Sequence, residues 1–379
     1  MSLVLTDEQE LIKQAAAEFL KENSPVTHLR EMRDSEDPAG FSKKLWKEMA
    51  ELGWAGIPFA EEVGGAGLGF ADLGVLLEEC GRTLAPYPFL STVVLGGGAV
   101  ALGGSEAQQQ AILQGVCKGE TFVALAFQET GRFSPWAIDA KAEKAGAGFR
   151  LSGEKIFVLD GHVADHLVVA ARTSGSAGER EGITLFLVAP ATEGCTVTRT
   201  IMVDSRNAAR VELSGASVAA DAVRGEGDRG ADILDVIFDR AAAALSAEMV
   251  GLTSEVFERT VDYLKTREQF GVRIGSFQAL KHRAAAMFCE VELAQAVVLD
   301  ALRALDEERP YASRTVSAAK ARCSDAASLV TCEGLQMHGG IGMTDEEEIG
   351  LFLKRAKAAE LTLGDAAYHR DRFARLTGF

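Results

Sequence analysis

The hydrophobic periodicity of the chain changes twice, and this change constrains the fold more than any other feature. From residue 5 to about 118, apolar residues recur at helical spacing, interrupted by the glycine-rich loop "IPFAEEVGGAGLGF". From about 119 to 229 the pattern shortens to near-alternating, β-branched runs such as "HLVVAAR" and "CTVTRTI". From about 230 onward, three long alanine-rich stretches and a shorter pair indicate helices again. We therefore predict an α+β fold with an N-terminal helical domain (1–118), a central antiparallel β-domain (119–229) and a C-terminal four-helix bundle (230–379).

Length and charge exclude several classes of protein. A chain of 379 residues is long enough for two or three domains. Its net charge of −16 argues against nucleic acid or an anionic membrane surface as a partner, because both select for basic patches. No uninterrupted apolar run approaches the length of a membrane-spanning helix. The acidic start does not resemble a signal peptide, and Thr6 with Gln9 predicts a capping box for a first helix. We expect a cytoplasmic protein.

The six cysteines are scattered and include no Cys-x-x-Cys pair. In a chain of this size we interpret them as reduced core residues, and we expect neither a disulfide framework nor a metal site. They are Cys80, Cys117, Cys195, Cys289, Cys323 and Cys332.

The stretch "YLKTREQFGVRIGSFQALKHRAAAM" (263–287) interrupts two long helical segments with polar residues and a turn. Gly271 supplies the turn, and a helix–helix corner lets Arg267 project outward. A planar guanidinium can bind a pyrophosphate in bidentate fashion, while Gln269 adds an amide and Phe270 a flat apolar surface. The alternative is a capped corner whose arginine pairs with a surface carboxylate.

A second segment, "LQMHGGIGMTDEEEIG", places Gln336 before the paired glycines Gly339 and Gly340. Without a Cβ, these glycines allow another backbone or a flat ligand to approach closely. The alternative is a routine helix terminator. The segment matches neither the Rossmann nor the Walker fingerprint, and Thr344 with Glu347 predicts a capping box for the following helix.

These two segments together resemble the acyl-CoA dehydrogenase family. The first is similar to the family's "Y…R.QFG.PI..FQ" signature and the second to its "Q..GG.G" segment. The resemblance covers nearly the whole chain, because the helix–β–helix order, the loop "IPFAEEVGGAGLGF" and the segment "SGEKIFVLDGHVADHLVVAART" also fit the family. The segments "GRTLAPYPFLST" and "LTLGDAAYHR" look like the family's two-subunit branch, which is linked to steroid side chains and dicarboxylic acids.

The resemblance implies an FAD bound between the β-domain and the bundle within a tetramer. Arg267 would reach a flavin pyrophosphate, generally that of a neighbouring subunit, and further residues of the bundle would lie along the same nucleotide: Phe270, Gln278, Gln336, Gly339 and Gly340. On the β-domain, Phe127, Gln128 and Glu129 match the strand beside the flavin ring, and Phe157, Val158 and Leu159 match the segment that covers its other face.

The sequence also departs from the family pattern. Gln128 stands where the family usually has Thr, and Phe157–Leu159 replaces Trp-Ile-Thr or Trp-Ile-Ser, so the expected hydroxyls are missing. Gln128 could replace one of them, whereas Leu159 cannot. Arg132 and Trp136 stand where small residues of the family leave room for substrate.

The carboxylate that removes the α-proton of the thioester is missing from both of the family's usual positions. By resemblance these positions fall at Leu363 and Ala241, and a neighbouring family arginine falls at Ala242. Asp365 is the nearest substitute base, and its alternative is an N-cap for the last helix. Asp239 and Glu248 are further candidates for the base, and we expect each of them to be an ordinary helix-surface or interhelical charge instead. We expect His338 and His369 to be satisfied polar residues rather than bases.

Three functions follow from the resemblance. The first is an FAD-dependent acyl-CoA dehydrogenase that oxidises a thioester to the 2,3-enoyl-CoA and passes electrons to an electron-transfer flavoprotein. The second is a non-catalytic partner subunit that completes the FAD site of a catalytic paralogue in a mixed tetramer, rather than a homotetramer. A third is a homologous flavin enzyme with other chemistry, such as a monooxygenase or an oxidase.

Overall fold

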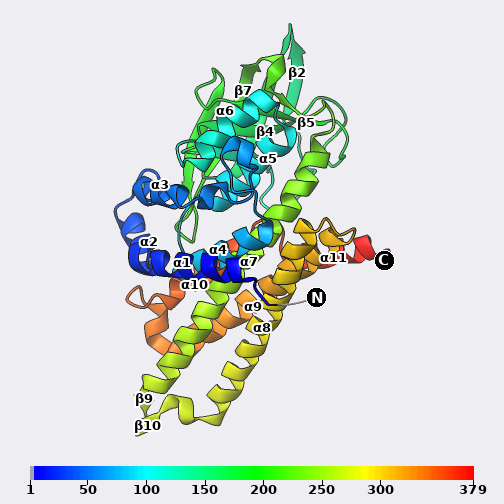
Figure 1. The fold of residues 1–379 in the computed structure, drawn as a ribbon. Helices are drawn as coiled ribbons and strands as arrows, with labels where there is room; N and C mark the ends of the chain where they lie inside the picture. Colours follow the sequence, from blue (N-terminus) through cyan, green and yellow to red (C-terminus); the bar gives the residue numbers. More distant parts are fainter. Residues whose placement is uncertain (1–3) are drawn as a thin grey trace. The chain divides into compact units, whose positions relative to one another are not determined.

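The computed structural model describes residues 4–379 (Figure 1). These residues form two compact units, which we describe separately. Unit 1 comprises the residues up to Glu31, Phe70–Ala85 and Ala242–Phe379, and unit 2 comprises Met32–Gly69 and Pro86–Ala241. The periodicity therefore predicted the type of secondary structure along the chain, whereas the predicted boundaries of three domains stay a prediction.

Unit 1 is helical. Its elements include α1 (Asp7–Asn23), most of α2 (Val26–Asp34), α4 (Phe70–Thr83), the later part of α7 (Gly230–Thr266), β9 (Glu268–Gln269), β10 (Val272–Arg273), η5 (Ile274–Ser276), α8 (Gln278–Asp306), α9 (Ala312–His338), η6 (Gly339–Met343), α10 (Ile349–Leu361) and α11 (Ala366–Thr377). The capping box predicted at Thr6 and Gln9 is confirmed at the start of α1. The box predicted at Thr344 and Glu347 is wrong, because α10 begins only after Glu348 and the Thr344 hydroxyl donates to the Ile341 carbonyl instead.

Helix packing in unit 1 brings distant segments of the sequence together. α9 packs against α8, α10 and α11, and α4 packs against α8. Where α4 meets α7, a Cβ added to Gly251 would lie 1.7 Å from the Glu78 carbonyl oxygen, so only glycine allows the two backbones to touch. Between α7 and α10, the buried Glu248 carboxylate accepts from Arg355 at 3.0 Å. Glu248 is thus an interhelical charge, as expected.

Unit 2 contains short helices and one sheet. The helical elements are α3 (Lys43–Glu51), η1 (Trp54–Gly56), η2 (Glu61–Val63), the π-helix η3 (Phe89–Gly97), α5 (Gly98–Gly103), α6 (Glu106–Cys117), η4 (Ala220–Ala222) and the beginning of α7. The strands are β1 (Val123–Ala126), β2 (Lys141–Ala145), β3 (Gly148–Leu159), β4 (His166–Arg172), β5 (Ile183–Val188), β6 (Cys195–Ile201), β7 (Asn207–Val218) and β8 (Val223–Arg224).

The eight strands form a sheet of order β6-β7-β3-β2-β4-β5-β8, with β1 beside β4. The predicted antiparallel pairing holds for β2–β3, β3–β7, β4–β5, β5–β8 and β6–β7, whereas β1 and β2 pair with β4 in parallel. Alternating residues of these strands fill one apolar core, which includes Leu151, Leu167, Phe186 and Val211. Across residues 4–379, no helix has both the length and the apolar character that a membrane span requires.

The prediction that all six cysteines are core residues is partly wrong. Cys80, Cys117 and Cys323 are buried, but Cys289 and Cys332 are exposed on α8 and α9. Each of these two helices has one face toward the core and one toward the surface, and both cysteines lie on the surface face. The residue type alone therefore did not identify their environment.

Candidate functional site

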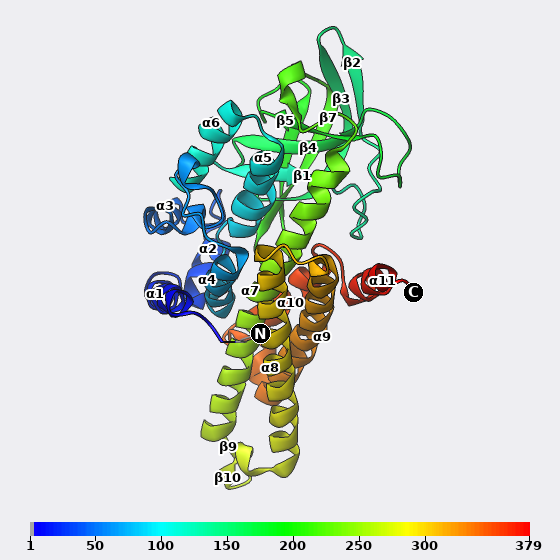
Figure 2. The ribbon, with the colours of Figure 1, turned by 45° about the vertical axis from the view of Figure 1, so that its right-hand side comes forward.

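The corner between α7 and α8 is a rigid hairpin that carries the first group of predicted site residues (Figure 2). The Arg267 amide donates to the Tyr263 carbonyl at 2.8 Å, and the Ile274 amide donates to the Arg267 carbonyl at 2.9 Å. The turn places Phe270 at φ +56° and Gly271 at φ +77°. Phe270 is 90% exposed, and it destabilises the folded chain in two ways: its left-handed backbone is strained, and its ring leaves apolar surface in water. Such a residue is typical of a binding surface.

The side chain of Arg267 is exposed and forms no hydrogen bond or ion pair with any residue of 4–379. The alternative in which Arg267 pairs with a surface carboxylate is therefore not realised among the residues that the structure describes. Gln278, the first residue of α8, is exposed as well. The corner presents a guanidinium, an amide and an aromatic ring to the outside.

The Gly339–Gly340 segment lies near the same end of the bundle, because α9 is tied to α7 just before it. The Tyr263 hydroxyl donates to the His338 carbonyl at 3.3 Å, and the two rings stack with centroids 4.4 Å apart. Added Cβ atoms at Gly339 and Gly340 would meet nothing within 4 Å, so both glycines face open space. The structure thus brings the arginine corner and the paired glycines together, with Gln336 exposed beside them.

In unit 2, the end of β1 meets a bulge in β3, and this junction carries the second group of predicted residues. The Ile156 amide donates to the Gln128 carbonyl at 2.8 Å. The β3–β7 register shifts between Lys155 and Val158, which leaves Phe157 at φ +51° and 45% exposed. Leu159 continues the strand opposite Ala208, and Phe127 is buried. Gln128 and Phe157 are therefore neighbours, as the resemblance implies.

A buried ion pair lies under this junction, and no motif in the sequence predicted it. The Lys155 ammonium, which is fully buried, donates to Glu129 at 2.5 Å and to the Phe127 carbonyl at 3.4 Å. Glu129 also accepts from the amides of Asp139 (2.8 Å) and Ala140 (3.1 Å). Burial lowers the pKa of Lys155 to about 8, against the opposing attraction of the Glu129 carboxylate.

The two positions at which the family's carboxylate would be expected are both buried and apolar. Ala241 lies in α7, and Leu363 lies in the turn before α11 with φ +60°. This turn is held by buried donors: the Lys320 ammonium donates to the Gly364 carbonyl at 2.9 Å, and His369 Nε2 lies 2.9 Å from the Leu363 carbonyl. Burial lowers the pKa of His369 to about 3, so the ring is neutral and Nε2 carries the proton that the carbonyl accepts.

Asp365 is the N-cap of α11, and its carboxylate accepts from the Tyr368 amide at 2.8 Å. This confirms the capping role that was its alternative to a catalytic base. His338 is a satisfied polar residue, as expected, because its Nδ1 atom lies 2.7 Å from the Gly334 carbonyl. For His369 that expectation is only half right: Nε2 meets the Leu363 carbonyl, whereas the buried Nδ1 has no hydrogen-bond partner among the described residues. Asp239, the other candidate carboxylate, is buried.

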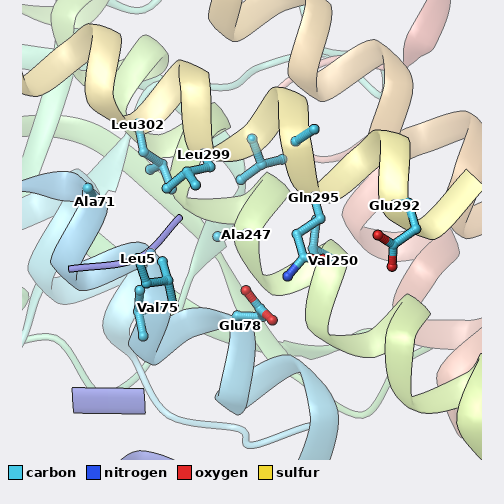
Figure 3. A pocket seen from close by; sticks show the side chains of 13 residues that line it. Leu5, Ala71, Val75, Glu78, Ala247, Val250, Glu292, Gln295, Leu299 and Leu302 are labelled. Carbon is cyan, nitrogen blue, oxygen red and sulfur yellow. The ribbon is translucent and has the colours of Figure 1, made fainter. Parts of the chain in front are cut away.

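Unit 1 also contains a cavity of about 340 Å³ between α4, α7 and α8 (Figure 3). Apolar side chains such as Leu5, Val75 and Leu302 line one part of it, and Glu78, Glu292 and Gln295 gather at the other. None of the predicted site residues lines this cavity. Among residues 4–379, no group of three or more His, Cys, Asp or Glu side chains is placed to hold a metal ion.

Comparisons with known proteins agree over the whole chain. Residues 6–120 match the model of the N-terminal domain of acyl-CoA dehydrogenases, residues 129–216 that of the middle domain, and residues 228–377 that of the C-terminal domain. The chain is 31% identical over 363 residues to the acyl-CoA dehydrogenase IpdE2 of Mycolicibacterium smegmatis, covering 95% of this chain and 96% of that one. It is 28% identical to the probable acyl-CoA dehydrogenase YngJ of Bacillus subtilis, covering 99% of each chain.

Solved structures give the same result. The butyryl-CoA dehydrogenase of Megasphaera elsdenii superposes with a TM-score of 0.91 at 25% identity, and a chain of the ChsE4–ChsE5 complex of Mycobacterium tuberculosis superposes with a TM-score of 0.89 at 28% identity. Each comparison covers 100% of both chains.

Proposed function

The chain belongs to the acyl-CoA dehydrogenase family, and from this premise we propose that it acts in the α,β-dehydrogenation of an acyl-CoA thioester to the 2,3-enoyl-CoA, with FAD as cofactor. An electron-transfer flavoprotein is the expected electron acceptor. The comparisons support the reaction class, since relatives that match along nearly the full chain are acyl-CoA dehydrogenases by name. The acyl group, the acceptor, the cytoplasmic location and the tetrameric assembly are parts of this proposal.

The observation that carries the proposal is the unpaired Arg267 at the hairpin corner. A guanidinium has five N–H donors in a fixed plane, which suits the two phosphates of a dinucleotide. Phe270 offers an exposed ring and Gly340 an open backbone, so the residues present fit an extended dinucleotide. Gln278, Gln336 and Gly339 would contact the same molecule. In unit 2, Phe127, Gln128, Phe157 and Leu159 would contact a flavin ring.

FAD, when bound, supplies the acceptor for the hydride that leaves the β-carbon. The chain itself must then supply the polar contacts that orient the thioester and a base for the α-proton. With Ala241 and Leu363 apolar, Asp365 is the nearest carboxylate in the sequence to the second position, and its Oδ1 atom accepts from the Tyr368 amide. As a base, Asp365 would have to act through its other oxygen or leave the cap.

This geometry favours a second candidate function. In it, the chain is a partner subunit that uses Arg267 to complete the FAD site of a paralogue, and the paralogue brings the carboxylate. Such a subunit needs no base of its own, which agrees with the buried, apolar environments of Ala241 and Leu363. The likeness to a chain from the ChsE4–ChsE5 complex supports a mixed assembly as well.

One experiment separates the two functions. The chain is purified alone, its flavin absorbance is recorded, and a panel of acyl-CoA thioesters is added under anaerobic conditions. A yellow protein that is bleached by one thioester supports independent catalysis. A protein that gains flavin only when it is co-expressed with a glutamate-bearing paralogue supports the partner role. A protein that binds no flavin in either form contradicts both.

A further inference from the structure

The loop 130–138 of unit 2 carries an aromatic residue that is enclosed on both sides. The Arg180 guanidinium lies over the Trp136 ring, 4.6 Å from its centroid. On the α7 side, the Phe238 ring lies 6.2 Å from Trp136 at an interplanar angle of 55°. Trp136 therefore contacts both a cation and an aromatic ring.

The backbone of this loop is held as firmly as the ring. The Trp136 carbonyl accepts from the Gly178 amide at 2.8 Å and from a terminal nitrogen of Arg172 at 3.2 Å. Arg172 is buried, and its Nε donates to the Ile138 carbonyl at 2.6 Å. Its remaining donors reach the carbonyls of Glu179 and Glu181. One buried arginine thus joins the loop 130–138 to the loop that carries Arg180.

Arg180 in turn binds the first turns of α7. Its guanidinium pairs with Asp235 and lies 3.9 Å from Asp232. The carboxylates fix the plane of the guanidinium, and that plane covers Trp136. An exposed cation–π contact alone is weak, so the ion pairs with α7 are needed to hold Arg180 in one position.

The enclosed ring belongs to a cluster that spans the two places where the proposed reaction needs its groups. Phe238 contacts Phe127 at 4.7 Å and Phe133 at 5.5 Å between centroids. Phe127 begins the segment expected beside the flavin ring, and Phe238 lies one helical turn before Ala241, one of the two base positions. The thioester of the proposed function would lie between these places, so the side chains of the aromatic cluster would bound the space open to its acyl group.

We propose that Trp136 is a specificity-determining residue for the acyl group, that Arg180 is the positioning residue that holds its ring against the start of α7, and that together they exclude branched or cyclic acyl groups in favour of narrow, straight ones. This inference rests on the proposed function, because it assigns the acyl-group selectivity of the same site. The residues themselves lie within one compact unit.

The test uses the flavin-loaded protein, co-purified with its paralogue if it has one. Three variants are compared with wild type: Trp136→Ala, Arg180→Gln, and the control Arg229→Gln. Arg229 also pairs with Asp232, at 2.7 Å, but it has no contact with the ring in the part of the chain that the structure describes. Calorimetric titration gives the Kd values of butanoyl-CoA and cyclohexanecarbonyl-CoA for each protein.

Wild type is expected to prefer butanoyl-CoA. Trp136→Ala should reduce that preference about tenfold, since pocket contacts discriminate by roughly one to two orders of magnitude. Arg180→Gln should shift it in the same direction by a smaller factor, and Arg229→Gln should leave it unchanged. Equal preference ratios in wild type, Trp136→Ala and Arg180→Gln would overturn the proposal.

A second readout does not depend on substrate. Trp46 and Trp54 are buried, so acrylamide quenching of tryptophan fluorescence reports mainly on Trp136. Arg180→Gln should increase the quenching constant about twofold because it uncovers one face of the ring, and Arg229→Gln should not. Unchanged quenching in Arg180→Gln refutes the positioning role by itself. Quenching could increase in Arg180→Gln while neither thioester binds to any flavin-loaded protein. In that case the contact between Arg180 and Trp136 is real, but the proposed function is refuted, and the assigned specificity is refuted with it.

Discussion

The substitution Glu129→Gln tests whether the buried ion pair under the β1–β3 junction is as consequential as its burial indicates. Glu129 is the only carboxylate that contacts the Lys155 ammonium in the described part of the chain, and Lys155 is fully buried. Burial lowers the pKa of Lys155 from 10.5 to about 8 even with Glu129 present. That difference corresponds to about 3 kcal/mol of unfavourable free energy for the charged form at neutral pH. Removing the compensating charge lowers the folded-state pKa of Lys155 further, and at pH 7 the additional loss is limited to about 1.4 kcal/mol, because a buried lysine whose pKa falls below 7 loses its proton instead.

The pH dependence has a definite sign. Because the folded-state pKa of Lys155 lies below the unfolded value, the unfolded state binds more protons between pH 8 and 10.5, and the unfolding free energy of wild type rises with pH through that window. Glu129→Gln lowers the folded-state pKa further. Its deficit relative to wild type is therefore fully present only below the lowered pKa of the variant, is about 1.4 kcal/mol at pH 7, and disappears as the pH rises through about 8, where Lys155 becomes neutral in both proteins.

Urea denaturation at pH 7 and pH 9.5, at one protein concentration and with saturating FAD, measures this deficit. Two further variants serve as controls. Glu154 lies on the same strand as Lys155, and Glu154→Gln breaks its exposed ion pair with Arg210 of β7. This substitution should lower the free energy of unfolding by less than about 1 kcal/mol. Adding Lys155→Met to Glu129→Gln should restore most of the loss, since no buried charge is then left unpaired. A deficit that is the same at both pH values, or below about 1 kcal/mol at pH 7, would refute the reasoning.

Three other substitutions test the candidate site. Arg267→Ala should weaken FAD binding about tenfold, whereas Arg273→Ala, on the other strand of the same hairpin, should not; equal flavin content of the two purified variants would argue against a phosphate contact. Asp365→Asn keeps a good N-cap and should change the unfolding free energy by less than about 0.5 kcal/mol; flavin bleaching at the wild-type rate excludes the carboxylate as the base, and its abolition in a stably folded variant would identify it. Gly340→Val, whose side chain would project into open space, should lower flavin content with only a small change in Tm; unchanged flavin content would exclude a close backbone contact there.

The sequence was sufficient for the broad architecture because periodicity reports directly on burial. Helical spacing identified the long helices, and alternation identified β3, β4, β5, β6 and β7. The strand β2 was missed, since "KAEKA" is short, polar and mostly exposed and so lacks an alternating apolar signal. The parallel pairing of β1 with β4 was missed for another reason: strand order is set by long-range packing, which local patterns do not encode.

The candidate site divides in the same way. Arg267, Phe270 and the paired glycines were identifiable because their residue types are unusual at a helix end. The partnership of Lys155 with Glu129 was not, because a lysine within a strand ordinarily indicates a solvent-facing position. Phe127, Trp136 and Phe238 belong to one aromatic cluster although roughly one hundred residues lie between Trp136 and Phe238 in the sequence. No spacing rule connects positions so far apart. The role of Asp365 could be decided only from the structure, because an N-cap and a displaced base both predict an aspartate just before the last helix.

The glycine contact between α4 and α7 also determines how this chain can be divided. Gly251 of α7 contacts the α4 backbone at Glu78, so the segment Phe70–Ala85 packs with the C-terminal helices. In the sequence, all strands of the large sheet lie between these two parts of the chain. A fragment that begins after the N-terminal helical region would leave a trough along α7 with no side chains to fill it. We expect the C-terminal helices to fold well only when α4 is supplied, either in the same polypeptide or as a complementing peptide.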